Sequence, residues 1–238
     1  MISVITCVND EKIYNKCFER SKLGEQHGIS DIVMLDNTGG RYKSAAEALN
    51  IGLQTADQDL VVCCHQDVFF PEDWAKKLYI NIEKAKKVSC GKMGVLGTAG
   101  VLNTGEKRGY MQDGDYGYWN EDGPRFGPVQ TVDESCFIFD KSSGLKFDER
   151  FDHFHFYGAD LCLQALHKGL INFGIDAPVI HYSGGGESSM GTGRAIFERE
   201  MMKLKKKWIS RFPVIWTTTV VLSPRKEAVL ADYLKGKR

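Results

Sequence analysis

Three consecutive polar residues, His65, Gln66 and Asp67, interrupt an otherwise apolar stretch that runs from Leu60 to Phe70. The five apolar residues before them predict a short buried strand, of the kind found in the middle of a parallel sheet. A buried strand alone gives no reason for a carboxylate, but ligands bind at the carboxyl ends of strands in open α/β sheets. We therefore expect Asp67 to meet a metal ion or a phosphate-bearing substrate, rather than to be a simple turn residue.

Other polar residues are more ambiguous. His181 ends a predicted strand before a glycine-rich loop, where it could bind a metal ion or be a buried histidine with ordinary hydrogen bonds. Asp160 lies in the first turn of a predicted helix, where the helix dipole favours the ionised carboxylate. It could be a general base, which requires a positioned carboxylate, or the N-cap of that helix. His65 is expected to hydrogen-bond locally. The following acids are expected to be solvated or to structure loops: Asp113, Asp115, Asp133 and Glu134.

The elements that position these residues alternate between strand and helix in the first third of the chain. Strands are predicted at 2–8, 31–35 and 60–64, and a helix at 12–23. A second helix follows Ser44, with Glu47 at the spacing of a capping box. This β-α-β-α-β order predicts a parallel sheet with right-handed crossovers.

The remainder of the chain continues the alternation around one long irregular segment. Residues 103–128 show neither helical nor strand periodicity and are rich in glycine and aromatic residues, with Tyr116–Trp119 as a candidate binding surface. Helices are predicted at 72–87, from near Asp160 to Gly169, at 194–208 and at 225–234. Strands are predicted at 93–102, 129–139, 171–180 and 214–221, and residues 184–193 form a glycine-rich loop.

Composition narrows the class of protein. A length of 238 residues suits one domain. The 31 basic and 31 acidic residues balance, so nothing global indicates nucleic acid. Seven cysteines without C-x-x-C spacing indicate reduced core thiols, and neither a signal peptide nor an apolar span of ~18–20 residues is visible. We expect a cytoplasmic protein. The lysines of Lys203–Lys207 either end a helix favourably or touch the inner membrane surface.

Two nucleotide-binding fingerprints are missing. The first strand is followed by V-N-D-E-K in place of G-x-G-x-x-G, which argues against an oxidoreductase, and no G-x-x-x-x-G-K-[ST] loop occurs. A nucleotidyltransferase is also disfavoured, because the glycine-rich basic loop that it needs after Val8 is absent.

In order and spacing, the landmarks between Ile2 and Tyr182 resemble the nucleotide-sugar glycosyltransferases of the GT-A fold, and most closely the family-2-like group of small bacterial enzymes. The resemblance implies an α/β, Rossmann-like fold with a mostly parallel sheet flanked by helices. It implies a single domain over 1–238, with a donor-nucleotide half at about 1–102 and an acceptor and catalytic half at about 103–190. A C-terminal strand and helix extension follows at 191–238.

The resemblance also assigns roles to residues. The polar turn after the first strand, with Thr6, Val8 and Asn9, would hold the nucleotide, and Asp36 at the end of the second strand would read its base. Residues 48–52 match A-x-N-x-G and place Asn50 against the donor. The metal-binding D-x-D motif falls on residues 65–67, with its first acid replaced by His65. Residues 156–163 match F-x-G-x-D-x-x-L, the pattern in which the acid, here Asp160, is the general base.

The function implied is transfer of a sugar, such as a hexose, from a nucleotide diphosphate donor such as a UDP-sugar to a carbohydrate or lipid-linked acceptor, with inversion. Asp67, with His181 as a second candidate ligand, would hold Mn²⁺ or Mg²⁺, and such an ion stabilises the leaving diphosphate as a Lewis acid. The identity of the acceptor, the nucleobase of the donor and the oligomeric state stay open. Because His65 replaces an acid, the alternative is a protein of the same fold that binds a nucleotide or sugar without turnover.

Overall fold

The computed structural model describes residues 1–114, 117–182, 193–225 and 227–229. Its centre is a seven-stranded sheet in the order β10-β13-β5-β12-β3-β1-β2. β1 pairs in parallel with β2 and β3, and β13 with β5, whereas β12 and β10 run antiparallel to their neighbours. The predicted mostly parallel α/β sheet is therefore confirmed. The strands are β1 (Ile2–Val8), β2 (Ile29–Asp36), β3 (Leu60–His65), β5 (Met93–Gly97), β10 (Gly127–Val129), β12 (Cys136–Asp140) and β13 (Ile171–Gly174).

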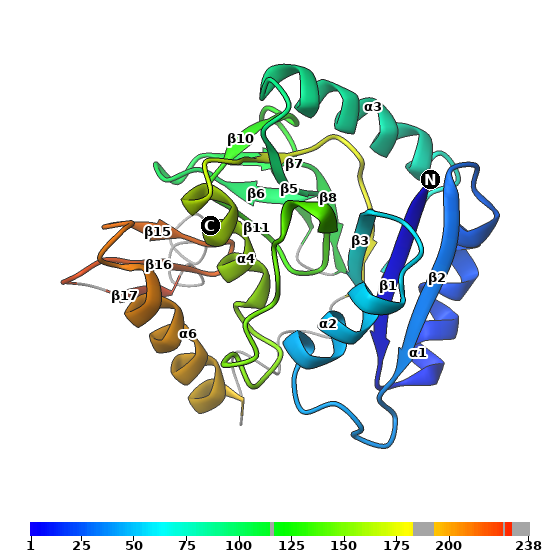
Figure 1. The fold of residues 1–238 in the computed structure, drawn as a ribbon, viewed down its shortest axis with the longest axis horizontal. Helices are drawn as coiled ribbons and strands as arrows, with labels where there is room; N and C mark the ends of the chain where they lie inside the picture. The colour runs from blue at the N-terminus through cyan, green and yellow to red at the C-terminus, as the bar shows by residue number, and fades with distance from the viewer. Residues whose placement is uncertain (115–116, 183–192, 226, 230–238) are drawn as a thin grey trace.

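Helices cover both faces of this sheet (Figure 1). In β3, Val62 and Cys64 join the core that contains α1 (Glu11–Lys16) and α3 (Trp74–Val88). The alternate residues Val61 and Cys63 join the core formed with α2 (Ala45–Thr55) and α4 (Tyr157–His167). Because both faces of β3 are buried, its sequence is continuously apolar up to the polar residues that follow it.

α4 is buried on two sides. Leu161, Cys162 and Ala165 pack toward the sheet. Ala159 and Leu163 instead join a third core with α6 (Arg194–Trp208) and the strands β15 (Ile215–Trp216) and β16 (Val220–Leu222). α4 therefore lies between the sheet and the C-terminal elements, as Figure 1 shows, and this position explains why almost every residue of the helix is apolar or small.

The largest difference from the predicted elements concerns the C-terminus. The helix predicted at 225–234 is wrong at 227–229, where β17 (Glu227–Val229) extends the antiparallel pair β15-β16. The other residues of that helix, apart from Arg225, lie outside the described part of the chain, as do residues 184–192 of the glycine-rich loop. The predicted strand at 214–221 is a hairpin, β15 and β16, because residues between them turn the chain back.

Short strands replace the irregular segment predicted at 103–128. β7 (Lys107–Gly109) joins β6 (Ala99–Val101) and β11 (Thr131–Val132) in one small sheet. A second small sheet has the order β4-β14-β8-β9, formed by β4 (Val68–Phe69), β14 (Ile180–His181), β8 (Met111–Asp113) and β9 (Tyr118–Trp119). Gly109 connects β7 with β8 at a φ of +87°, and a Cβ there would lie 2.3 Å from the Thr98 carbonyl oxygen, so only glycine fits this position.

Two predicted helices have different bounds. α1 ends at Lys16, because the chain continues as two 3₁₀ turns, Glu19–Ser21 and Leu23–Glu25, separated by Lys22 at a φ of +50°. α4 begins at Tyr157, three residues before Asp160, so Asp160 lies inside its first turn and is not its N-cap. Among the helices of the described residues, none is both long and apolar enough to cross a membrane.

Candidate active site

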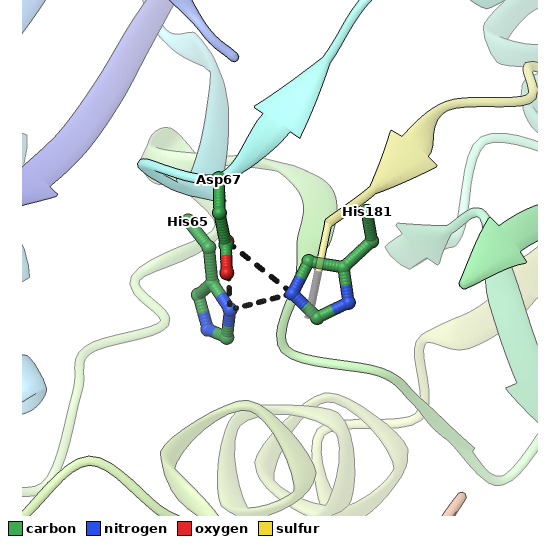
Figure 2. A group of neighbouring side chains, drawn as sticks. All are labelled: His65, Asp67 and His181. Atoms are coloured by element: carbon green, nitrogen blue, oxygen red, sulfur yellow. Dashed lines mark hydrogen bonds and ion pairs between the residues drawn. The ribbon is translucent and has the colours of Figure 1, made fainter. Parts of the chain in front are cut away.

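Asp67 lies at the carboxyl end of β3, next to two histidines from different parts of the chain. β3 ends at His65, and only Gln66 and Asp67 separate it from the start of β4. β14 pairs antiparallel with β4 and parallel with β8, with His181 opposite both Val68 and Asp113. This pairing brings His181 to the sheet edge at which β3 ends. Figure 2 shows the carboxylate of Asp67 directed between the imidazole rings of His65 and His181.

The three side chains are close enough to share one ligand. Oδ1 of Asp67 lies 3.3 Å from Nε2 of His181 and 3.9 Å from Nδ1 of His65. The same two ring nitrogens lie 3.4 Å apart. One donor atom from each residue can be chosen so that all three lie within 4.8 Å of one another. The His181 side chain is 12% exposed, that of Asp67 22% and that of His65 39%, so the group is partly buried and solvent reaches it mainly at His65.

The outward nitrogen of each histidine has its own partner. Nδ1 of His181 lies 3.0 Å from Oδ1 of Asp113, and Nε2 of His65 lies 3.0 Å from the hydroxyl of Tyr157 at the start of α4. These contacts fix the orientation of both rings and leave Nε2 of His181 and Nδ1 of His65 facing Asp67. Histidines that bind metals are oriented in this way, by a carboxylate or another polar group on the second nitrogen.

The charges of this group depend on one another. Burial alone would lower the pKa of His181, but its contacts with Asp113 and Asp67 outweigh burial and raise that pKa to about 10. Burial would raise the pKa of Asp67, but contact with His181 outweighs it and lowers that pKa below its usual value. Without another ligand, the site is therefore an imidazolium held between two carboxylates.

The same residues also suit a divalent metal ion. Oδ1 of Asp67 is buried and lies 3.3 Å from Nε2 of His181, but it accepts no hydrogen bond of good geometry from any described residue, so a further ligand would improve its contacts. Two imidazole nitrogens and one carboxylate oxygen suit Mn²⁺, whereas Mg²⁺ prefers oxygen ligands alone. Binding of an ion would require Nε2 of His181 to lose its proton.

The residues expected to hold a nucleotide occupy different environments. Thr6 and Val8 are buried within β1, at 0% and 3% exposure, and Thr6 Oγ1 has no hydrogen-bond partner among the described residues. Asn9 is exposed in the turn after β1. Asp36, at the end of β2, pairs with Val8 across the sheet, so the ends of both strands meet at the edge where β3 presents Asp67.

Gln66 joins this turn to the loop after β3. Its Oε1 accepts the backbone N–H groups of Asn9, at 2.9 Å, and Asp10, at 3.0 Å. Its Nε2 donates to Oδ1 of Asn9. The side chain thus holds the expected nucleotide turn and the loop that carries Asp67 in one fixed arrangement.

Asp36 and Asn50 have structural partners. Asp36 is exposed, and its Oδ1 accepts both the N–H and the hydroxyl of Thr38, which lowers the pKa of the carboxyl. Asn50 lies on α2, where its amide exchanges hydrogen bonds with the backbone of Phe147 and donates to Glu149. Asp36 remains at the donor edge, whereas Asn50 ties α2 to the loop before α4. Their roles toward a nucleotide stay predictions.

Asp160 is separated from solvent. It is 0% exposed. Trp208 Nε1 donates to its Oδ1 at 2.6 Å, Lys207 Nζ lies 2.7 Å from the same oxygen, and Gln164 Nε2 donates to Oδ2 at 2.7 Å. These contacts anchor α6 to α4. The expectation that Asp160 is the general base stays a prediction, and the structure does not place this side chain with Asp67 and His181.

Sequence reasoning gave little weight to four residues that the structure brings to this edge. His65 faces Asp67, Asp113 holds His181, and Tyr157 holds His65. Glu134 lies beside the start of α4, where its Oε1 accepts the Gly158 N–H at 2.8 Å. The one available signal was the H-x-D spacing of residues 65–67, because the other three residues reach this edge only through long-range contacts. Asp113 depends on the short strands β8 and β14, Tyr157 on the position of α4, and Glu134 on the pairing of β12 with β3.

The sheet and the helices on both of its faces have the fold of GT-A glycosyltransferases. Residues 3–184 match the sequence profile of the glycosyltransferase-like family, and the chain belongs to that family. A protein of Fuscovulum blasticum described as "ATP synthase subunits region ORF 6" is 25% identical over 218 residues, which cover 89% of this chain and 83% of that protein.

Two solved structures share the fold at low sequence identity. The mannosyltransferase PcManGT from Pyrobaculum calidifontis, in complex with GDP-Man and Mn²⁺, matches with a TM-score of 0.56 and 11% identity over 88% of this chain. TarS 1–349 of S. aureus, in complex with UDP-GlcNAc, matches with a TM-score of 0.56 and 14% identity over 87% of this chain. The matches span 64% and 66% of those two chains, so both contain substantial parts without a counterpart here.

Proposed function

We propose that this protein transfers a sugar from a nucleotide diphosphate donor to a hydroxyl group of a carbohydrate or lipid-linked acceptor. The observation that carries the proposal is the group formed by His65, Asp67 and His181. It lies at the carboxyl edge of a GT-A sheet, beside the polar turn after β1. Ligands of open α/β sheets bind at this edge.

The donor diphosphate would lie between the turn after β1 and this group. Asp67, His181 and His65 would hold a divalent ion, for which their donor atoms favour Mn²⁺. When bound, such an ion neutralises the charge that develops on the leaving diphosphate. Asp113 and Tyr157 would keep the two imidazoles oriented, and Thr6, Asn9 and Asp36 would contact the nucleotide. PcManGT with GDP-Man and Mn²⁺ and TarS with UDP-GlcNAc have the same fold, which supports this class of donor.

An aromatic pair supports a place for the acceptor. Tyr110 and Tyr118 stack with ring centroids 5.7 Å apart and planes 3° from parallel, and Tyr118 is 48% exposed. Tyr118 lies in β9, next to β8, which carries Asp113 of the site. Sugars pack on exposed aromatic faces, so this pair is the acceptor surface that we propose. Tyr116 of the predicted surface lies outside the described residues. Reaction with inversion is part of the proposal, and the anomeric configuration of the product, read by NMR, tests it.

The rival is a protein of the same fold that binds nucleotide or sugar without turnover. The observation that favours it is the locked position of Asp160, whose side chain is fully buried among donors from α4 and α6. Release of nucleoside diphosphate from UDP-GlcNAc or GDP-mannose by the wild-type protein would exclude this rival.

The first experiment measures the thermal stability of the full chain with UDP, GDP, CDP or TDP, with and without Mn²⁺. A ligand that binds only the folded state, present at a hundredfold over its Kd, adds about 2.7 kcal/mol of stability. We expect one nucleotide to stabilise the wild type in the presence of Mn²⁺. Asp67→Ala should lose this effect. Asp73→Ala is the matched control, because Asp73 is an exposed acid whose ion-pair partner among the described residues is Lys77, and it should keep the effect.

Each outcome has a definite meaning. If Asp67→Ala abolishes a metal-dependent stabilisation that Asp73→Ala preserves, the result supports the metal site and identifies the nucleobase of the donor. Equal stabilisation without Mn²⁺ would remove Asp67 from a metal role and indicate a metal-independent transferase. No response of the wild type to any of the four nucleotides would contradict the proposed function.

A further inference from the structure

A further carboxylate, that of Glu134, contacts the start of α4 beside the candidate active site. Glu134 precedes β12, and the carbonyl of its neighbour Ser135 accepts the backbone N–H of His65 at 2.9 Å. The amino end of antiparallel β12 therefore lies against the carboxyl end of β3. Glu134 accepts the N–H of Gly158, and Tyr157, the residue before Gly158, contacts the His65 ring. Glu134 is thus connected to the site through two short paths.

Glu134 and Asp160 differ in what a carboxylate needs to accept a proton from a substrate. Asp160 has no exposed surface, and three side chains, one of them a lysine, donate to its oxygens. Glu134 is only partly buried, and its hydrogen-bond donors among the described residues are backbone N–H groups at the start of α4, with no side chain among them. A lysine that is 22% exposed, an indole and an amide already engage the lone pairs of Asp160, whereas no side chain of the described residues competes with an acceptor hydroxyl for those of Glu134.

The surroundings of Glu134 favour proton uptake near neutral pH. Burial raises the pKa of its carboxyl to about 8; the Gly158 N–H opposes this shift, and the negative charge of Asp133 adds to it. The other titratable groups that face Glu134 are Tyr157 and Cys162 on α4. A general base is most effective when its pKa lies near the working pH.

We propose that Glu134 is the general base of the glycosyl transfer, and that Asp160 anchors α6. This inference rests on the proposed function. The acceptor oxygen forms a bond to the anomeric carbon, while the bond from that carbon to the diphosphate oxygen breaks and its electron pair leaves with the nucleoside diphosphate. The proton of the acceptor hydroxyl passes to Glu134 and from there to solvent.

The test compares Glu134→Gln with Asp160→Asn in the full chain. Glutamine keeps an oxygen that accepts the Gly158 N–H, so the start of α4 stays intact and only the basic carboxylate is lost. The assay is hydrolysis of UDP-GlcNAc or GDP-mannose in the presence of Mn²⁺, followed as released nucleoside diphosphate, with water as the acceptor. Each variant is assayed below its own unfolding midpoint, and its Mn²⁺-dependent stabilisation by the free nucleotide is measured in parallel.

We expect Glu134→Gln to lose about 10²-fold or more in hydrolysis rate, the usual effect of removing a general base, while nucleotide binding is retained. The wild-type rate should rise with pH up to about 8, whereas the residual rate of Glu134→Gln should not follow that titration. Asp160→Asn should retain hydrolysis. If Glu134→Gln is active and Asp160→Asn is not, the proposal is overturned and Asp160 is the base. A wild type that binds nucleotides and hydrolyses donor with a pH-independent rate also overturns it. A wild type that neither binds nucleotide nor releases it contradicts the proposed function itself.

Discussion

Replacing Asp160 by asparagine is expected to destabilise the fold strongly, because the hydrogen bonds of this buried carboxylate join α4 to α6. Hydrogen bonds to a charged group contribute about 1.5–3 kcal/mol each. Asparagine can still accept from one of the three donors, but it loses the charge that neutralises Lys207, whose side chain is only 22% exposed. The expected loss is about 2–4 kcal/mol of unfolding free energy. At about 2–4 °C per kcal/mol for a chain of this size, the melting temperature should fall by about 5–15 °C.

A matched control, Asp152 in the loop before α4, also contacts α6. Asp152 accepts a hydrogen bond from Lys203 at 2.8 Å and pairs with Arg199, but its side chain is 58% exposed. Asp152→Asn should therefore cost about 1 kcal/mol or less. Urea unfolding, followed by circular dichroism, gives both free energies. If Asp160→Asn costs no more than Asp152→Asn, the joint between α4 and α6 does not depend on Asp160, and the argument is refuted.

Two further predictions concern stability away from the site. The Arg150 guanidinium holds the pKa of Asp148 well below its usual range. The stability that this carboxylate contributes is therefore present at neutral pH and is lost as the pH falls below about 3.9, the pKa of an aspartate in the unfolded chain. In urea unfolding between pH 7 and about pH 3, the stability of Asp148→Asn should depend less on pH than that of the wild type. Gly52→Ala should lower the free energy of unfolding by about 1–3 kcal/mol, because the new Cβ would lie 2.4 Å from Cγ2 of Ile5 and force α2 away from the sheet. Gly39→Ala is the control: a Cβ there has nothing within 4 Å, so the same measurement should show little change.

Most of the fold could be predicted from local patterns. The continuous apolar run of β3 indicated a strand buried on both faces, and the capping box at Ser44 indicated the start of α2, where Ser44 Oγ does accept the Glu47 N–H. α6 has the predicted bounds. Local patterns did not indicate β17, because a strand of three residues is stabilised by pairing with β16 rather than by its own sequence.

The candidate site could be predicted only in part, for a physical reason. Asp67 stood out because it follows a buried strand, whereas the partners of His181 depend on where β14 pairs with β4 and β8, and these strands have two or three residues each. The sequence pattern around Asp160 predicted the start of a helix. It could not predict that the last turn of α6 supplies Lys207 and Trp208 as hydrogen-bond donors to this carboxylate. Glu134 became visible only when β12 was placed beside β3.

The hydrogen bonds of the Gln66 side chain affect how ligands would bind at the neighbouring site. Its three hydrogen bonds join the turn at Asn9 and Asp10 to the loop that presents Asp67. A ligand that orders either segment therefore also orders the other, so the free energy of arranging both is spent only once. Metal and nucleotide should accordingly bind with positive cooperativity, and by thermodynamic reciprocity each would strengthen the binding of the other by the same factor. The Gln66 side chain would in this way couple the binding of the metal ion to the binding of the nucleotide.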